Sequence, residues 1–408
     1  MEINKYFPFA FIYFFFNSLG LPLGLTYTTL LAPLLYYWVL ITRKREILLP
    51  FFVALIPFFI IQVNEGVDLK TYFVSILNFT AVYIFCQAFY TFLKNCKNIE
   101  GIFRKLVIVN FILCLIAIPL YFTDYYYILW IKQFLTEGVD EFLRLKLFTY
   151  EASYYATLFT PLFFFYFLKI NLGQNKKNSF LLLVLIFLPY LLSFSLGVIS
   201  AIMISIIITY VLVFRYIGRQ KRFWWIGIIV SCSTVLLLMA LFIFFPDNAL
   251  FQRIGNIISG NDLSGRGRTS DAFLLGNKIL HLRNVFFGIG PGQIKVIGAN
   301  IIRDYYNYPP DYNVIAIPNA TAETLVIFGT LGIILRFYAE LFFFIYTRVW
   351  TNYYRLLLFV FIFLYQFTGS FISNLAEYVI WIMAFTRGFP QFDVKGEKPL
   401  LNKIYQNE

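Results

Sequence analysis

Long apolar runs separated by short polar segments make up most of the chain. Runs of this length with few charged residues are typical of helices that cross a lipid bilayer. They cover residues 6–18, 25–42, 47–63, 71–93, 106–122, 153–170, 180–193, 198–217, 223–245, 325–347, 355–371 and 374–387. The sequence therefore predicts an all-α polytopic membrane protein, a helical bundle with about 12 transmembrane helices.

Two of the intervening polar segments are longer than a simple turn requires. Residues 123–152 form the shorter loop and residues 246–318 the longer one. The two loops and the apolar runs divide the chain into six expected regions. They are spans one to five (1–122), the shorter loop (123–152), spans six to nine (153–245), the longer loop with short helices (246–318), spans ten to twelve (319–390) and a tail (391–408).

The composition excludes a soluble protein. Hydrophobic residues make up 60% of the chain and charged residues only 13%, whereas a soluble domain carries about 25% charged residues. The net charge of +12 does not indicate a nucleic-acid partner, because Lys and Arg gather in every second loop. That alternation sets the orientation of a membrane protein. We therefore expect a multi-pass protein with both termini in the cytoplasm and both longer loops on the outer face.

The shorter loop ends in two charged residues just before the span at 153–170. Arg144 and Glu151 are seven positions apart, so in a helix they would share one face. A glutamate at the mouth of a span needs a partner or water. The two residues predict either a structural ion pair at the interface, or an anion-binding arginine with an orienting or basic carboxylate.

The longer loop carries seven cations despite its expected outer location. Its segment 264–271 reads Ser-Gly-Arg-Gly-Arg-Thr-Ser-Asp, with Arg266 between two glycines and Arg268 after the second, and apolar residues at helical spacing follow. Glycines, guanidinium groups and a helix N-terminus capped by Thr269 or Ser270 favour phosphate binding. A solvated charged surface is the alternative. The glycines of segment 288–292 predict a tight turn that returns the loop to the membrane, since no Gly-Lys-Ser/Thr follows.

A third group of polar residues accompanies the span at 325–347. Asn319 and Glu323 share a helical face, and Arg336 and Glu340 are spaced to form an ion pair. An arginine inside a span is expected to face protein or water rather than lipid.

Tyrosines gather in both loops. Tyr125, Tyr126 and Tyr127 are adjacent in the shorter loop, which is typical of a belt at a lipid interface. A second group, Tyr305, Tyr306, Tyr308 and Tyr312, surrounds two prolines and is also suited to stacking on the apolar faces of sugar rings. His281 is the only histidine and no cluster of carboxylates is visible, so we predict neither a metal nor a cofactor.

The order of these pieces resembles the O-antigen polymerase and O-antigen ligase family of bacterial integral membrane glycosyltransferases. The resemblance covers residues 144–335 together with the span pattern, and it includes the turn Ser193-Phe-Ser-Leu-Gly197. Ligases of this family carry a histidine just before the asparagine that corresponds to Asn319. Here that position is Pro318, which favours the polymerase over the ligase.

The resemblance implies a polymerase that joins undecaprenyl diphosphate-linked oligosaccharide repeat units by glycosyl transfer at the periplasmic face of the bacterial inner membrane. The implied partners are that lipid-linked substrate, the bilayer and a chain-length regulator protein. A ligase and a flippase or transporter of the lipid-linked oligosaccharide are the alternatives.

Arginines suit a developing negative charge on diphosphate, because guanidinium groups stay charged and bind phosphate through two hydrogen bonds. We therefore expect catalytic roles for Arg266, Arg268 and Arg144, with Glu151 and Glu323 as base or as orienting groups. Substrate contacts are expected from Arg283, Arg303, Asn319, Tyr305 and Tyr306.

Overall fold

The computed structural model describes residues 6–15, 26–133, 142–174, 179–217, 255–256, 259–260, 262–311 and 315–394. The expected span at 223–245 lies outside the described residues, as do most of 246–261 and residues 395–408 of the expected tail.

Every expected apolar run within the described residues contains a helix. These helices are α1 (Phe7–Phe15), α2 (Tyr27–Leu30), α3 (Ala32–Arg43), α4 (Leu48–Asn64), α5 (Leu69–Asn95), α6 (Ile99–Leu120), α7 (Ala152–Asn171), α8 (Ser179–Ser193), α9 (Leu196–Ile217), α15 (Ala320–Tyr346), α16 (Tyr353–Tyr365) and α17 (Leu375–Phe385). Short 3-10 turns lie at Tyr126–Ile128, Gln293–Lys295, Val349–Thr351 and Pro390–Phe392. The prediction of a mostly helical protein is confirmed.

Fewer of these helices than expected are long enough to cross a membrane. Among the described residues, three qualify by length and composition, namely α5, α6 and α15, and a fourth span results if α3 and α4, bent by 119° at their junction, count as one. A span needs about 20 residues, whereas α8, α16 and α17 have 15, 13 and 11. The apolar helices indicate a membrane protein, and the count of twelve spans is not confirmed.

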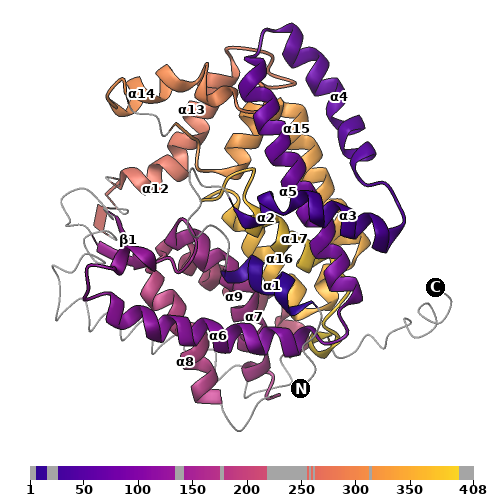
Figure 1. Cartoon of the computed structure of the whole chain (residues 1–408), viewed down its shortest axis with the longest axis vertical. Helices are drawn as coiled ribbons and strands as arrows, with labels where there is room; N and C mark the ends of the chain where they lie inside the picture. Colours follow the sequence, from indigo (N-terminus) through magenta and orange to yellow (C-terminus); the bar gives the residue numbers. More distant parts are fainter. Residues whose placement is uncertain are drawn as a thin grey trace.

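The three described helices that are long enough to cross a membrane do not all run in the same direction. In Figure 1, α5 and α15 run along the vertical axis, whereas α6 runs across the lower part of the molecule. Helices α12 (Leu263–Arg268), α13 (Ser270–Leu280) and α14 (Ala299–Tyr306) gather at one corner, at the upper left of the view.

Helix α7 forms the centre of the largest apolar core. Seventeen of its 20 residues are buried, and Phe163, Phe164 and Phe165 are at most 2% exposed. The core also draws on α1, α5, α6, α8, α9, α16 and α17. Because α7 is enclosed by protein, its tyrosines and threonines need no contact with lipid, and its N-terminal residue Ala152 is fully buried.

The shorter loop departs from the all-α expectation. It contains an antiparallel hairpin of β1 (Trp130–Gln133) and β2 (Phe142–Leu145), in which Ile131 pairs with Arg144. Leu129, Trp130 and Leu145 bury their side chains against α6 and α7, and the Trp130 indole donates a hydrogen bond to the Ala117 carbonyl at 2.8 Å. Hence the expectation that Arg144 and Glu151 share a helical face is wrong, since Arg144 lies in a strand.

The longer loop has a core of its own. The spacing that predicted a helix after residue 270 is confirmed, because Ala272, Leu275 and Ile279 of α13 are buried against α14 and α15. Leu282, the next position in that series, lies beyond the end of α13 and is 48% exposed. The loop helices are therefore fixed directly on α15.

The glycine-rich turn returns the longer loop to the membrane helices, as expected, by pairing with a break in α15. Gly329 has φ 67° and ψ −166°, so the helix is interrupted there. The amides of Ile289 and Gly290 donate to the carbonyls of Val326 and Ile327 at 2.9 and 3.1 Å. On the other side of the break, the amides of Thr330 and Leu331 donate to the carbonyls of residues 285 and 286 at 3.0 and 3.1 Å.

A buried amide secures the same turn from α4. Gln62 is 1% exposed, and its Nε2 donates to the carbonyls of Phe287 and Ile327 at 2.6 and 2.9 Å. The Tyr72 hydroxyl of α5 donates to Gln62 Oε1 at 3.0 Å. Helices α4 and α5 are thereby joined to the backbone groups that the break in α15 leaves unpaired, which buried polar groups require.

Candidate functional site

Arg268 and Glu151 form an ion pair between the longer loop and the start of α7. Arg268 lies in the last turn of α12, and its Nη2 is 3.3 Å from Glu151 Oε1. The side chains are 33% and 21% exposed. Burial lowers the pKa of Arg268, but attraction by Glu151 and Tyr365 outweighs burial and raises that pKa. A charged guanidinium is thus held at a site that solvent reaches.

Glu151 has a second partner on its own segment. The Ser153 hydroxyl donates to Glu151 Oε1 at 2.6 Å, and Glu151 is the N-cap residue of α7, although its side chain makes no capping bond. Both hydrogen bonds go to the same oxygen, which leaves Oε2 for other contacts.

Asn319 holds the backbone on which Arg268 stands. It is fully buried at the N-cap of α15, where its Oδ1 accepts from the Ala322 amide at 2.9 Å. Its Nδ2 donates to the carbonyls of Arg268 and Phe367 at 2.8 and 2.6 Å. Asn319 was expected to contact substrate, but its geometry is that of a positioning residue, because all three hydrogen bonds are to backbone.

Arg266 lies beside Arg268 and is bound by the loop helices. Its Nη2 is 3.5 Å from Asp271 Oδ1 and 3.4 Å from the Tyr305 hydroxyl. The carboxylate of Asp271 raises the pKa of Arg266. Thr269 occupies the N-cap of α13, but its hydroxyl donates to the Gly265 carbonyl at 2.8 Å and makes no capping bond.

The tyrosines of the longer loop form a group next to Arg266. The rings of Tyr305 and Tyr306 meet edge to face at 4.9 Å, and Tyr306 stacks on Tyr308 at 5.3 Å. A Cβ atom added to Gly267 would lie 3.2 Å from the Tyr306 hydroxyl. The end of α14 is therefore packed against the Gly-Arg segment of α12.

Arg144 is separate from this pair and is bound to the turn between α8 and α9. Its Nε donates to the Ser193 carbonyl at 3.0 Å, its Nη2 to the Ser195 hydroxyl at 3.0 Å, and its Nη1 to Gln133 Oε1 at 2.8 Å. Arg144 is 8% exposed. These contacts fix the hairpin on the membrane helices, so the contacts of Arg144 are structural rather than those of an open anion site.

Glu323 lies one turn into α15, and its carboxylate is engaged by backbone. Its Oε2 accepts from the Ile372 amide at 2.7 Å. The Tyr378 hydroxyl donates to the Ile372 carbonyl at 2.7 Å. Glu323 thus fixes the segment between α16 and α17.

The predicted ion pair of Arg336 and Glu340 is confirmed, with Nε 3.2 Å from Oε1. Arg336 also binds Glu377 of α17 and donates to Gln366 Oε1 at 2.7 Å. Gln366 in turn donates to Glu340 Oε2 at 3.1 Å. We call these four residues the Arg336 cluster, which joins α15, α16 and α17 inside the protein.

Two expected substrate contacts lie elsewhere. The Arg283 guanidinium is 3.3 Å from the Gly66 carbonyl, in the turn between α4 and α5. Arg303 donates to Asn300 Oδ1 at 3.4 Å within α14. Neither guanidinium makes a hydrogen bond to Arg266, Arg268 or Glu151 within the part of the chain that the structure describes.

Two neighbours of Arg268 were not anticipated from the sequence. Tyr365 at the end of α16 and Tyr150 before α7 both interact electrostatically with its guanidinium, and the Tyr150 ring stacks on Tyr154 at 4.7 Å. A tyrosine at the end of an apolar run is a common feature, so their sequence positions gave no functional signal.

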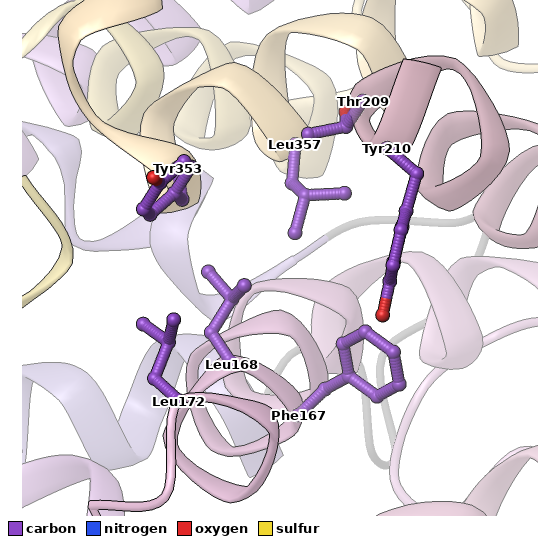
Figure 2. Close-up of a pocket in the computed structure, with 7 residues that line it drawn as sticks. All are labelled: Phe167, Leu168, Leu172, Thr209, Tyr210, Tyr353 and Leu357. Carbon is purple, nitrogen blue, oxygen red and sulfur yellow. The ribbon is translucent and has the colours of Figure 1, made fainter. Parts of the chain in front are cut away.

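A small cavity lies at the far end of α7 from Glu151. Figure 2 shows its lining by Phe167, Leu168, Leu172, Thr209, Tyr210, Tyr353 and Leu357, contributed by α7, α9 and the start of α16. It encloses about 10 Å³, room for about one water molecule. It contains none of the candidate site residues.

Among the residues that the structure describes, no three His, Cys, Asp or Glu side chains lie close enough together to bind one metal ion. No model of a known protein family matches the chain. A search of curated proteins likewise finds no significantly similar sequence.

Proposed function

We propose that this membrane protein is an O-antigen or other surface-polysaccharide polymerase, a glycosyltransferase that joins undecaprenyl diphosphate-linked oligosaccharide repeat units. The observation that carries the proposal is the Arg268–Glu151 pair, a solvent-accessible guanidinium next to a carboxylate. Arg266 stands on the same helix turn and is 44% exposed. Two such guanidinium groups suit a diphosphate better than any neutral ligand.

In the proposed glycosyl transfer, the two arginines would stabilise the leaving group. A hydroxyl oxygen of the incoming repeat unit attacks the anomeric carbon of the growing chain, and the bond from that carbon to the diphosphate oxygen breaks. Negative charge then develops on the departing undecaprenyl diphosphate. Arg266 and Arg268 stabilise this charge, and fixed charges that need no reorganisation are the most effective stabilisers of a transition state.

The hydroxyl must also lose its proton, and we assign that proton to Glu151 rather than to Glu323. Glu151 Oε1 is bound by Ser153 and Arg268, and we assign the acceptor hydroxyl to the other oxygen, Oε2. Glu323 is bound to the Ile372 amide, and in the part of the chain that the structure describes it makes no hydrogen bond or ion pair with Arg266 or Arg268.

The proposed setting is the periplasmic face of the bacterial inner membrane, with both termini in the cytoplasm. The alternation of basic loops supports this orientation, since it places the loops that carry Arg268 and Glu151 on the outer side. A chain-length regulator protein is the proposed protein partner. Neither a metal nor a cofactor is required by the steps above.

The test is polymerisation by the purified full chain in detergent, with undecaprenyl diphosphate-linked repeat units as the only substrate. Longer glycans are expected from the parent protein and from Arg45→Ala, a control at an exposed arginine remote from the site. Arg268→Ala and Glu151→Gln should give none, while Glu323→Gln should retain activity. If the parent protein makes no longer glycan, the proposal fails. In a second reaction with lipid A–core added, transfer only to that acceptor would indicate a ligase instead.

A transporter of the same lipid-linked oligosaccharide is a second candidate, and one observation favours it. Helix α15 is broken at Gly329, and the Arg336 cluster lies farther along that helix. Interrupted spans and ionisable groups within spans are common in transporters. Movement of fluorescent lipid-linked sugar across proteoliposomes, without any longer glycan, would support this candidate over the polymerase.

A further inference from the structure

The tyrosines at the end of α14 are held in fixed positions. Ala299 and Ile302 bury one face of α14 in the core of the longer loop. Asn307 ends the helix with φ 53°, and the Tyr308 amide donates to the Arg303 carbonyl at 2.9 Å. Pro309 and Pro310 then restrict the backbone. Rigid tyrosines bind a ligand with little loss of side-chain entropy.

These tyrosines are next to the guanidinium groups proposed to bind diphosphate. The Tyr305 hydroxyl accepts from Arg266, and the Tyr306 hydroxyl approaches Gly267, between the two arginines. Tyr308 stacks on Tyr306 and keeps 38% of its surface exposed. A ligand whose phosphate lies on Arg266 therefore has an aromatic surface beside it.

We infer that Tyr305, Tyr306 and Tyr308 form a subsite for the sugar that is bonded directly to the diphosphate. A pyranose presents an apolar face of C–H groups, which packs on aromatic rings, and hydroxyl groups at its edge, which suit the hydroxyls of Tyr305 and Tyr306. This inference rests on the proposed function, since it takes the diphosphate to bind at Arg266 and Arg268.

Charge argues for a neutral sugar at this subsite. The cations on segments 262–280 and 299–311 are Arg266, Arg268, Lys278 and Arg303, and the anions on these segments are Asp262, Asp271, Asp304 and Asp311. Lys278 lies over the Tyr305 ring at 5.7 Å, and Asp271 is bound to Arg266. The two signs balance, so the ring surface rather than an excess of charge recognises the ligand.

The experiment compares two probes on the full-length protein in detergent. One probe is undecaprenyl diphosphate, and the other is undecaprenyl diphosphate bearing a single N-acetylglucosamine. The parent protein is expected to bind the sugar-bearing lipid about fivefold more tightly, the worth of one good aromatic contact. Tyr308→Ala should remove this advantage without changing binding of the sugar-free lipid, and Tyr308→Phe should keep it.

Two controls make the outcomes distinct. Tyr127→Ala, at a 60% exposed tyrosine of the shorter loop, should behave like the parent protein. Arg266→Ala should weaken both lipids equally. If the parent binds neither lipid, the proposed function fails. If it binds both with equal affinity, or if Tyr308→Ala keeps the full advantage of the sugar, the sugar subsite is wrong and the tyrosines belong to an interfacial belt.

Discussion

The guanidinium of Arg268 lies 3.3 Å from the carboxylate of Glu151, although 117 positions separate them along the chain. The pair connects the longer loop to the N-terminus of the most deeply buried helix. Since Asn319 also binds the Arg268 carbonyl, three segments meet at this one arginine.

Arg268→Lys should lower polymer yield while leaving membrane insertion normal. Lysine keeps the charge but loses the planar group that makes two parallel hydrogen bonds to phosphate. Losing one charge-assisted hydrogen bond is worth about 1.5–3 kcal/mol, or roughly a tenfold to hundredfold loss of rate. Polysaccharide ladders at equal protein level measure this. The exchanged pair Arg268→Glu with Glu151→Arg keeps an ion pair and should still make no polymer. Full activity of either variant would contradict the role of Arg268 in binding diphosphate.

Asn319→Asp should destabilise the protein and disturb Arg268. Aspartate still caps α15, but it cannot donate to the carbonyls of Arg268 and Phe367. It also places a negative charge at a position that is fully buried. Each buried acceptor left unpaired costs about 1–3 kcal/mol. Asn374→Asp is the matched control, because Asn374 caps α17 and aspartate caps equally well. Thermal unfolding in detergent should separate the two variants; equal melting temperatures would argue against the role of Asn319.

Arg336→Met should be the most destabilising single change in the Arg336 cluster. It leaves Glu340 and Glu377, which are 6% and 1% exposed, without their common cation. Removing one partner of a buried ion pair costs about 3–5 kcal/mol. Adding Glu340→Gln and Glu377→Gln removes the stranded charges and should restore much of the stability. A triple variant no more stable than Arg336→Met would show that the charges are not the cause.

Gly329→Ala should release the turn at 288–292 from α15. Gly329 has φ 67°, and a Cβ atom there would lie 2.3 Å from the Phe286 carbonyl oxygen. Limited proteolysis should then cut the longer loop faster than in the parent protein. At Gly197 of α9 nothing lies within 4 Å of an added Cβ, so Gly197→Ala should leave proteolysis unchanged. Parental resistance of Gly329→Ala would mean that the turn does not depend on the break.

Complete chelation of divalent metals should leave the proposed polymerase activity intact. The charge that develops on diphosphate is assigned to Arg266 and Arg268, which stay protonated at any physiological pH. Product ladders made with and without a strong chelator are the measurement. A loss of product that magnesium restores would assign that role to a metal instead.

Local spacing in the sequence was enough to predict only part of this molecule. The apolar runs predicted the helices, and the four-residue spacing of Arg336 and Glu340 predicted their pair. Their further partners Gln366 and Glu377 lie on other helices, so no local pattern contains them. The spacing of Arg144 and Glu151 was interpreted for a helix, whereas Arg144 lies in a hairpin that is stabilised by packing on α6 and α7, a contact that no local pattern contains.

The candidate site shows the same limit. Arg266, Arg268 and Glu151 were selected for their chemistry, and the fold determines which of them meet. Asn319 was selected as a ligand of substrate, whereas its contacts are to backbone. An asparagine before a helix has the same sequence signature in either role, since capping and ligand binding use the same amide group.

The break at Gly329 also constrains how this protein enters the bilayer. Before segment 285–290 reaches α15, the Val326 and Ile327 carbonyls and the Thr330 and Leu331 amides lack the partners described above. Unpaired backbone groups in hydrocarbon cost several kcal/mol each. These four groups stand at helical spacing, with Thr330 four residues after Val326 and Leu331 four residues after Ile327, so they pair with each other in an unbroken helix until the loop arrives. Closure of the loop then exchanges two bonds inside α15 for four bonds between α15 and segment 285–290.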